Sequence, residues 1–192
     1  MMESIDETIK EVDKILREAN NPNIQKFKDT PLVQYLIQQM VYRLLPSFTG
    51  GRPPWKKFGN YVCMEHFVLA NGCYYPGVRL GKFYKLGEIK HCYDNSREAL
   101  LEYPKLAYVE GYVTSVIPVA HAWNIDGNSE VVELTLREKY SPAKERAYFG
   151  VSFDTEYVVT TGGSLIDDWR NDWPLLRDAD LAKAVIIPPT KE

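Results

Sequence analysis

A cysteine, a histidine and a glutamate follow one another in the middle of the chain, and these residue types together can do nucleophilic chemistry. Cys92 comes first, His121 follows and Glu133 comes last. A thiol becomes a nucleophile when a base removes its proton, and imidazole is the most frequent base in proteins. A carboxylate can orient that imidazole and stabilise its cation. Cys92, His121 and Glu133 are therefore the candidate catalytic residues.

The position of Cys92 favours the reactive form of a thiol. Residues 95–101 have the composition of a helix, and Pro104 ends it, so Cys92 lies just ahead of a helix start. Unpaired backbone N–H groups and the helix dipole stabilise an anion at such a position. The thiolate is the nucleophile, so this placement supports a catalytic role for Cys92.

His121 and Glu133 are expected on the two strands of one hairpin. The sequence predicts a strand over residues 120–125, and alternation puts His121 and Trp123 on the same face of it. Asp126-Gly127-Asn128 is typical of a hairpin turn. The returning strand carries Glu133, and neighbouring strands of a hairpin bring such residues side by side.

The remaining elements frame this stretch. Apolar residues at helical spacing predict helices over residues 2–19, 31–45 and 164–176. Short apolar and aromatic runs predict strands over residues 61–69, 73–75, 106–119 (as one strand or two), 130–136, 148–153 and 184–189 (or an extended tail). We therefore expect an α+β fold, with a helical extension over residues 1–50 packed on a catalytic domain over residues 51–192.

Composition excludes several classes of function. The net charge of −3 gives no electrostatic reason to expect nucleic acid as a partner. No apolar run approaches the roughly 20 residues that cross a bilayer, and residues 1–18 are too charged for a signal peptide, so no membrane partner is expected. Three cysteines cannot all pair within one chain, which fits a reducing compartment. We expect a cytoplasmic protein.

A metal site is the main chemical alternative. Cys63, His66, Cys73 and His91 would make a Cys₂His₂ set. Structural zinc usually takes closely spaced ligand pairs on both sides, whereas eighteen positions separate Cys73 from His91. If residues 61–69 form a strand, the side chains of Cys63 and His66 also point to opposite faces. We therefore expect neither a metal nor another cofactor.

Four segments of the central stretch resemble the core of the transglutaminase-like superfamily of cysteine enzymes. These segments are Cys92-Tyr93-Asp94-Asn95, Tyr108-Val109-Glu110-Gly111-Tyr112, His121-Ala122-Trp123 and Val131-Val132-Glu133-Leu134-Thr135. A later segment, Tyr148-Phe149-Gly150-Val151, is similar to one in uncharacterised bacterial and phage members. The resemblance covers roughly residues 88–153. The family usually has aspartate where this chain has Glu133.

The resemblance implies a papain-like core, in which the helix that carries the nucleophile packs on an antiparallel sheet. It also implies Cys92 as nucleophile, His121 as base and Glu133 as orienting acid. In such a site the backbone N–H of the nucleophile is one oxyanion donor, and a side chain such as Asn71 or His66 is a candidate for the second.

Four residues around the triad are candidates for binding substrate: Trp123, Glu110, Asn95 and Asn71. Two of them have an alternative: Trp123 suits a core as well as a cleft wall, and Glu110 is either an ion-pair partner beside the site or exposed.

The resulting hypothesis is a cysteine-dependent hydrolase or acyltransferase that acts on an amide bond of a protein or peptide through a thioester. The alternative is an inactive member of the same superfamily that binds a protein or peptide.

Overall fold

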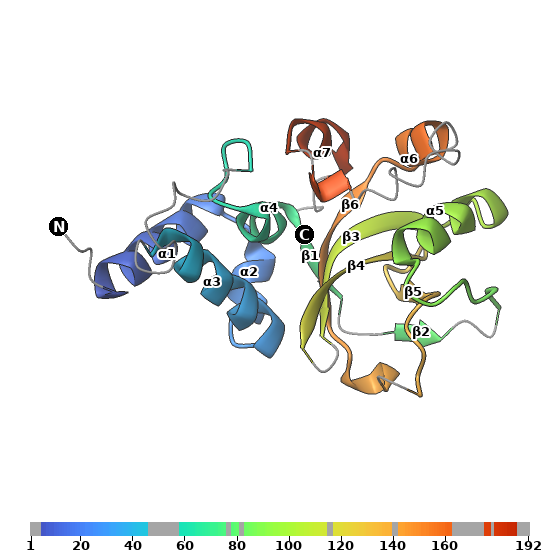
Figure 1. Cartoon of the computed structure of the whole chain (residues 1–192), viewed down its shortest axis with the longest axis horizontal. Coiled ribbons are helices and arrows are strands. Elements are labelled where there is room, and N and C mark those ends of the chain that lie inside the picture. Colours follow the sequence, from blue (N-terminus) through green and yellow to red (C-terminus); the bar gives the residue numbers. More distant parts are fainter. Residues whose placement is uncertain are drawn as a thin grey trace.

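The computed structural model describes residues 5–45, 58–75, 78–80, 83–114, 117–139, 142–162, 175–177 and 179–187. Figure 1 shows an α+β arrangement, with the N-terminal helices on one side and a curled sheet with further helices on the other. None of the described helices is both long and apolar enough to cross a membrane. The predicted α+β class is confirmed at this level.

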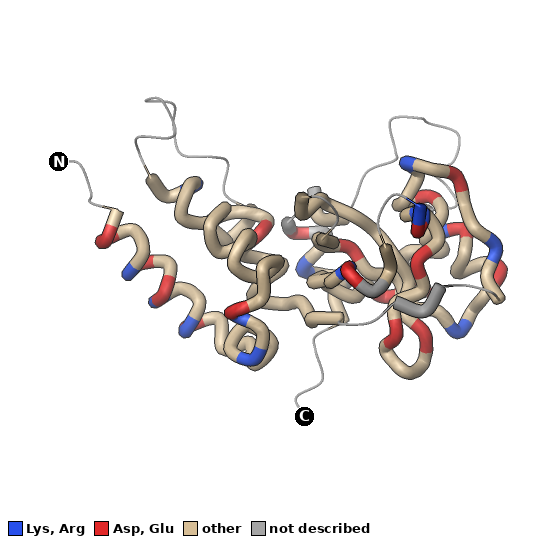
Figure 2. The backbone as a smooth tube through the Cα atoms, turned by 90° about the horizontal axis from the view of Figure 1, so that it is seen from below, with Lys and Arg blue, Asp and Glu red and all other residues tan. Residues whose placement is uncertain are grey.

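The N-terminal helices follow the apolar periodicity of the sequence. They are α1 (Ile5–Ala19), α2 (Pro22–Phe27) and α3 (Pro31–Leu44), so the two predicted helices are present and a short one lies between them. Acidic and basic residues follow one another along α1 (Figure 2), whose inner side buries Val12 and Leu16. Helices α1 and α3 pack against helix α4, which follows them, and α3 also contacts strands β3 and β6 of the sheet. The expected boundary near residue 50 lies outside the described residues.

Residues 61–69 do not form the predicted strand. Helix α4 occupies Met64–Asn71 instead, and buries Phe67, Val68 and Leu69. An apolar run this short satisfies the period of a helix as well as that of a buried strand, which is why the prediction was wrong. Asn71-Gly72 accordingly ends a helix, and the Gly72 N–H donates to the Val68 carbonyl.

Gly72 is required by a close approach of two backbones. A Cβ atom at this position would lie 2.7 Å from the carbonyl oxygen of Gly150 and 2.6 Å from that of Val68. The chain therefore passes directly from α4 to β1 (Cys73–Tyr75), the predicted strand that pairs with β6 (Tyr148–Phe153).

The sheet has the strand order β1-β6-β3-β4-β5-β2, with β7 (Ile186–Ile187) paired to β6. The predicted segment 106–119 contains β3 (Ala107–Thr114) and only the first two residues of β4 (Pro118–Ile125). The rest of β4 is the strand predicted over residues 120–125, and Pro118 is its first residue. Strand β5 (Val131–Glu133) follows the predicted turn. All neighbours are antiparallel except β2 (Val78–Leu80), which runs parallel to β5. The predicted antiparallel sheet is thus present, with one parallel edge strand.

The two faces of the sheet carry different side chains. Tyr108 and Tyr112 of β3 belong to the main core, which includes α1, α3, α4 and α5 (Cys92–Glu102). Val109 and Val113 belong to a smaller cluster on the other face, with Trp123 at its centre. This division follows from the alternation of side chains along a strand.

Short elements complete the fold. They are η2 (Ala143–Glu145), α6 (Thr155–Gly162), η4 (Leu175–Arg177) and α7 (Ala179–Val185). Most of the helix predicted over residues 164–176 lies outside the described residues. Its last two residues belong to the 3₁₀ helix η4, and β7 lies within the segment predicted as a C-terminal strand or tail.

Candidate active site

The site is centred on a buried contact between His121 of β4 and Glu133 of β5. His121 Nε2 lies 2.9 Å from Glu133 Oε2, and the two residues are only 3% and 1% exposed. A tight turn joins the strands, because the Asp126 N–H donates to the Glu130 carbonyl and the Ser129 N–H to the Asp126 carbonyl. The predicted hairpin therefore brings these two candidate residues into direct contact.

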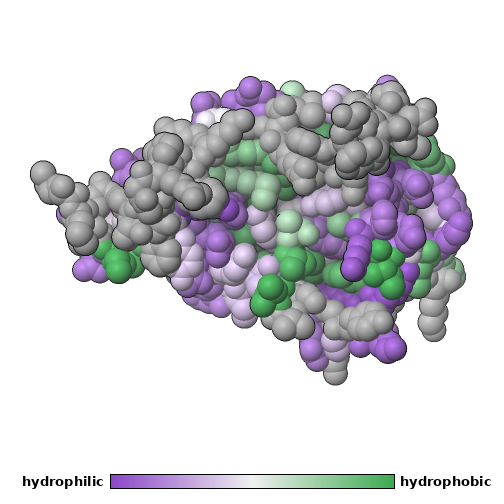
Figure 3. Space-filling model, in the orientation of Figure 1, coloured by the Kyte–Doolittle hydropathy of each residue, from purple (hydrophilic) through white to green (hydrophobic). Residues whose placement is uncertain are grey.

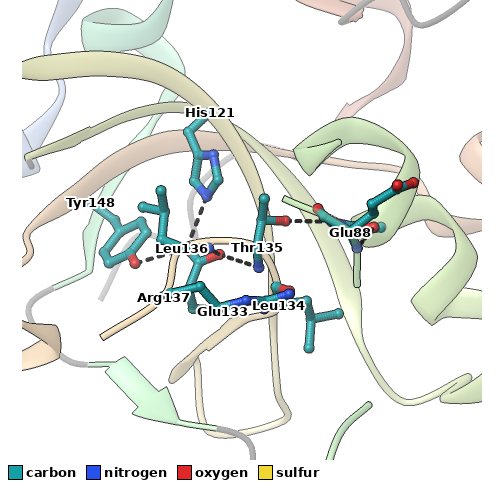
Figure 4. Close-up of polar contacts among 9 residues, drawn as sticks. Glu88, His121, Glu133, Leu134, Thr135, Leu136, Arg137 and Tyr148 are labelled. Atoms are coloured by element: carbon teal, nitrogen blue, oxygen red, sulfur yellow. Dashed lines mark hydrogen bonds and ion pairs between the residues drawn. The ribbon is translucent and has the colours of Figure 1, made fainter. Parts of the chain in front are cut away.

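Glu133 is held by four hydrogen bonds. Oε1 accepts from the backbone N–H groups of Thr135 (2.8 Å) and Leu136 (2.9 Å). Oε2 accepts from the Tyr148 hydroxyl at 2.9 Å and faces His121 (Figure 4). A carboxylate can accept about four hydrogen bonds, so both oxygens are satisfied and the side chain is fixed.

The electrostatics of the pair favour opposite charges. Burial lowers the pKa of His121, but the Glu133 carboxylate and Cys92 outweigh it and raise that pKa above its ordinary value. Burial raises the pKa of Glu133, yet the imidazolium and the two backbone N–H groups outweigh it and hold that pKa below its ordinary value. Two buried ionisable groups in contact therefore stabilise each other's charged forms.

Cys92 is a second polar partner of the same imidazole. It is the first residue of α5 and is half-buried, and its side chain forms a hydrogen bond with His121. Because Glu133 occupies Nε2, Nδ1 is the ring nitrogen that remains for the thiol. Helix α5 packs on β4, and the Asn124 side chain donates to the Ser96 carbonyl at 2.9 Å, which fixes the helix to the strand that carries His121.

The other two cysteines lie in surroundings that suppress the thiolate. Burial is the main cause that raises the pKa of Cys63 to about 12, and the nearby Glu65 adds to it. Burial also raises the pKa of Cys73. Both pKa values are shifted against thiolate formation near neutral pH.

Trp123 lies where strand alternation predicted it, on the same face as His121. Its ring is stacked with the imidazole at 6.2 Å and 19°. Trp123 is fully buried between Tyr75 and Tyr148, with edge-on contacts to both rings. Among the described residues its indole N–H has no hydrogen-bond partner. Trp123 therefore forms the apolar wall behind the imidazole.

Glu110 is not exposed and does not join the triad. Its carboxylate accepts from the N–H groups of Leu175 (2.8 Å) and Leu176 (3.0 Å), and from the Tyr108 hydroxyl (2.7 Å). Burial raises the pKa of this carboxyl. Glu110 thus anchors the 3₁₀ helix η4 on β3.

Asn71 and His66 lie on α4, whereas His121 and Glu133 lie on β4 and β5. The Asn71 side chain donates to the Tyr61 hydroxyl and the Phe67 carbonyl. His66 Nδ1 accepts from the Val62 N–H, and burial lowers the pKa of His66 to about 4. The contacts of both candidates for the second oxyanion donor therefore stay within residues 61–71.

The four residues weighed as zinc ligands lie in separate places. Cys63 and His66 flank the start of α4, Cys73 lies on β1, and exposed His91 precedes α5 and pairs with Asp94 at 3.3 Å. Within the described residues, no three His, Cys, Asp or Glu side chains are grouped so that they could hold a metal ion.

Tyr148 and Thr135 are the contributors to the site that sequence reasoning missed. Both lie inside segments that resemble the superfamily, but their residue types alone indicate no role in the site. Alternation along β6 would have put Tyr148 on one face with Gly150, yet the strand order that puts β6 beside β3 is a long-range property.

The chain matches no protein-family model, no curated protein and no solved structure. The function of the site is therefore argued from its geometry.

Proposed function

We propose that the chain is a cysteine-dependent hydrolase or acyltransferase that acts on amide bonds of a protein or peptide. One observation carries this proposal: the buried His121 imidazole has a carboxylate at 2.9 Å from Nε2 and the Cys92 thiol as its other polar partner. A base held between an orienting acid and a thiol is the arrangement that nucleophilic catalysis by cysteine requires.

The reaction proceeds in two balanced halves. The Cys92 thiolate attacks the amide carbon, a C–S bond forms, and the carbonyl π pair moves to oxygen. When the carbonyl re-forms, the C–N bond breaks and the His121 imidazolium gives its proton to the departing amine. Water or a second amine then adds to the thioester, neutral His121 takes the proton, and cleavage of the C–S bond returns the thiolate.

The developing oxyanion needs hydrogen-bond donors. Cys92 is the first residue of α5, and the first N–H groups of a helix have no partner within the helix. We assign the Cys92 N–H to the oxyanion because it lies next to the attacking sulfur and at the positive end of an 11-residue helix.

The order of elements supports a transglutaminase-like, papain-like core. The helix that begins at Cys92 packs on an antiparallel sheet, and β4 and β5 then supply the histidine and the acid. This is the arrangement that the four motifs imply. The sequence resemblance supports the proposed family and the similarity to its bacterial and phage members. The composition supports a cytoplasmic location.

The first experiment measures whether Cys92 is an activated thiol. The protein is treated with a limiting amount of iodoacetamide at pH 6–7, and each cysteine is quantified by mass spectrometry. We expect selective labelling of Cys92 over Cys63 and Cys73, and its loss in His121→Ala. Equal, slow labelling of all three cysteines would contradict the proposal.

The second experiment distinguishes hydrolysis from transfer. The protein is incubated with a casein digest, with and without a fluorescent primary amine, and free amine release is compared with incorporation of the dye. Cys92→Ala must abolish whichever signal is found, because this substitution removes the sulfur and little else.

A second candidate function is a binding module without chemistry. The loop that leads into Cys92 exposes three large apolar side chains, since Phe83, Leu86 and Ile89 are 85%, 50% and 50% exposed. Figure 3 shows hydrophobic areas of the surface separated by hydrophilic ones. Such side chains suit a protein or peptide partner. This function predicts that Cys92→Ala binds peptides as tightly as the natural protein and that neither turns them over.

A further inference from the structure

Asn95 forms a buried link between the helix of the nucleophile and the segment that follows the acid. It lies on α5, three residues after Cys92, and is almost fully buried. Its Nδ2 donates to the Thr135 hydroxyl at 2.8 Å and to the Glu88 carbonyl at 2.7 Å. Its Oδ1 accepts from the Glu88 N–H at 2.9 Å. Both hydrogens of the amide are therefore used inside the protein.

Thr135 carries this link to the acid. Its backbone N–H donates to Glu133 Oε1 at 2.8 Å, while its hydroxyl accepts from Asn95 (Figure 4 shows Thr135 between Glu133 and the segment of Glu88). Glu133 in turn holds His121, and His121 forms a hydrogen bond with Cys92. These contacts connect Cys92, His121, Glu133, Thr135 and Asn95 in that order. The first turn of α5, which carries both Cys92 and Asn95, closes the ring.

The loop ahead of Cys92 is fixed by the same segment. The Gly87 N–H donates to the Leu134 carbonyl at 3.0 Å, and the Arg137 side chain donates to the carbonyls of Gly87 and Leu134. Gly87 packs so closely on Asn95 that an added Cβ would lie 2.1 Å from the Asn95 side chain. Asn95 is therefore clamped between the loop on one side and Thr135 on the other.

We infer that Asn95 is a positioning residue of the proposed reaction, which acts through Thr135 to set the place of Cys92 relative to His121 and Glu133. This inference rests on the proposed function. The Asn124–Ser96 bond attaches α5 to β4. The Asn95–Thr135 bond is the second attachment, and it lies within one helical turn of the nucleophile.

The test removes one bond and leaves the rest of the ring. Thr135→Val deletes the hydroxyl that accepts from Asn95 and keeps the backbone N–H on Glu133, whereas Thr135→Ser keeps both. Thr8→Val is the matched control, because Thr8 is also buried but its hydroxyl has no partner among the described residues. Asn95→Ala is compared with Asn21→Ala, since the Asn21 side chain also holds two buried carbonyls, those of Leu69 and Gly72.

The first readout is the rate of Cys92 alkylation by iodoacetamide between pH 5 and 9, measured well below the melting temperature. We expect Thr135→Val and Asn95→Ala to react about fivefold more slowly at pH 6, the factor that corresponds to one neutral hydrogen bond. The difference should shrink at pH 9, where a free thiolate forms without help. Thr135→Ser, Thr8→Val and Asn21→Ala should keep the natural profile, even where their melting temperatures fall.

The second readout is the ¹⁵N resonances of the His121 ring, which report on its contacts whether or not Cys92 is reactive. We expect these resonances to shift in Thr135→Val and to stay in place in Thr135→Ser and Thr8→Val. Slow alkylation of the natural protein would overturn the proposed function, while the ring resonances would still decide the role of Asn95. A folded Thr135→Val protein with natural ring resonances and a natural profile would overturn this inference.

Discussion

Replacing Glu133 by glutamine tests the reasoning about the triad most directly. The substitution keeps the shape of the side chain and replaces one carboxylate oxygen by an amide group. If the remaining oxygen keeps the N–H groups of Thr135 and Leu136, the new NH₂ faces His121 Nε2 in place of Oε2. Nε2 must then accept a hydrogen bond, so the neutral ring carries its hydrogen on Nδ1. That tautomer cannot take a proton from Cys92.

The cost in stability follows from the bonds that change. A hydrogen bond to a buried charged group contributes about 1.5–3 kcal/mol, whereas the Tyr148 hydroxyl can rotate to accept from the new NH₂. His121 can lose its proton, and this limits the loss to less than that of an unpaired buried charge. We expect Glu133→Gln to lower the free energy of unfolding by about 2–3 kcal/mol at pH 6.

The cost in reactivity should be larger at low pH than at high pH. The imidazolium of the natural protein favours the thiolate form of a neighbouring thiol, whereas the neutral ring of Glu133→Gln does not. The higher nucleophilicity of the more basic thiolate offsets part of this difference, so about a tenfold slower alkylation of Cys92 remains at pH 6. In a Ser-His-Asp triad the equivalent change lowers kcat roughly 10⁴-fold, and a similar loss of amide turnover is expected.

The assay combines urea unfolding with iodoacetamide kinetics from pH 5 to 9. Glu138→Gln is the control, because Glu138 is exposed and lies five residues further along the chain. A Glu133→Gln protein with the stability and the alkylation profile of Glu138→Gln would refute the assigned role of Glu133.

Three further predictions concern the surroundings of the triad. The His121–Glu133 pair should stabilise the protein most between about pH 4.3 and 6.5, the ordinary pKa values of the two groups. The lowered pKa of Glu133 makes this contribution fall at lower pH, and the raised pKa of His121 makes it fall at higher pH. Urea unfolding of the natural protein and of Glu133→Gln, measured below, within and above this pH range, will test the prediction. Tyr148→Phe should lower the free energy of unfolding in urea by about 1–3 kcal/mol. It should lower the alkylation rate at pH 6 by less than Glu133→Gln does, because His121 keeps the Glu133 carboxylate as its partner. A decrease in this rate as large as that of Glu133→Gln would contradict this ranking. Glu110→Ala should lower the free energy of unfolding measured by calorimetry by about 2–4 kcal/mol, because three buried donors lose their acceptor. The rate of Cys92 alkylation well below the melting temperature should stay unchanged. Slower alkylation at that temperature would contradict this prediction and connect Glu110 to the site.

The contacts that sequence alone could predict are those set by local rules. Alternation along β4 put His121 and Trp123 on one face, and the Asp126-Gly127-Asn128 turn brought β5 back so that Glu133 meets His121. The helix start at Cys92 followed from composition and from Pro104. Each of these rules acts over at most about a dozen residues, within which the backbone geometry itself limits the alternatives.

The contacts that could not be predicted depend on tertiary packing. Residues 61–69 form part of a helix because α3 and the sheet cover the apolar face of α4, and its pattern alone fits either period. Glu110 was placed beside the site or on the surface, but it caps η4, which is 65 residues away in the chain. Tyr148 meets Glu133 only because the curled sheet brings β6 and the end of β5 to the same face.

The superfamily that the sequence resembles usually has aspartate at the position of Glu133, and the contacts of this glutamate are consistent with the proposed orienting role. Oε1 of Glu133 is held by the N–H groups two and three residues further along its own chain, while Oε2 faces His121 and Tyr148. One oxygen therefore anchors the side chain locally, and the other is presented to the imidazole in a fixed direction. Preorganised groups of this kind need no reorientation when charge develops on the base. The longer side chain can thus serve as the orienting acid because its own backbone removes the freedom that the extra methylene adds.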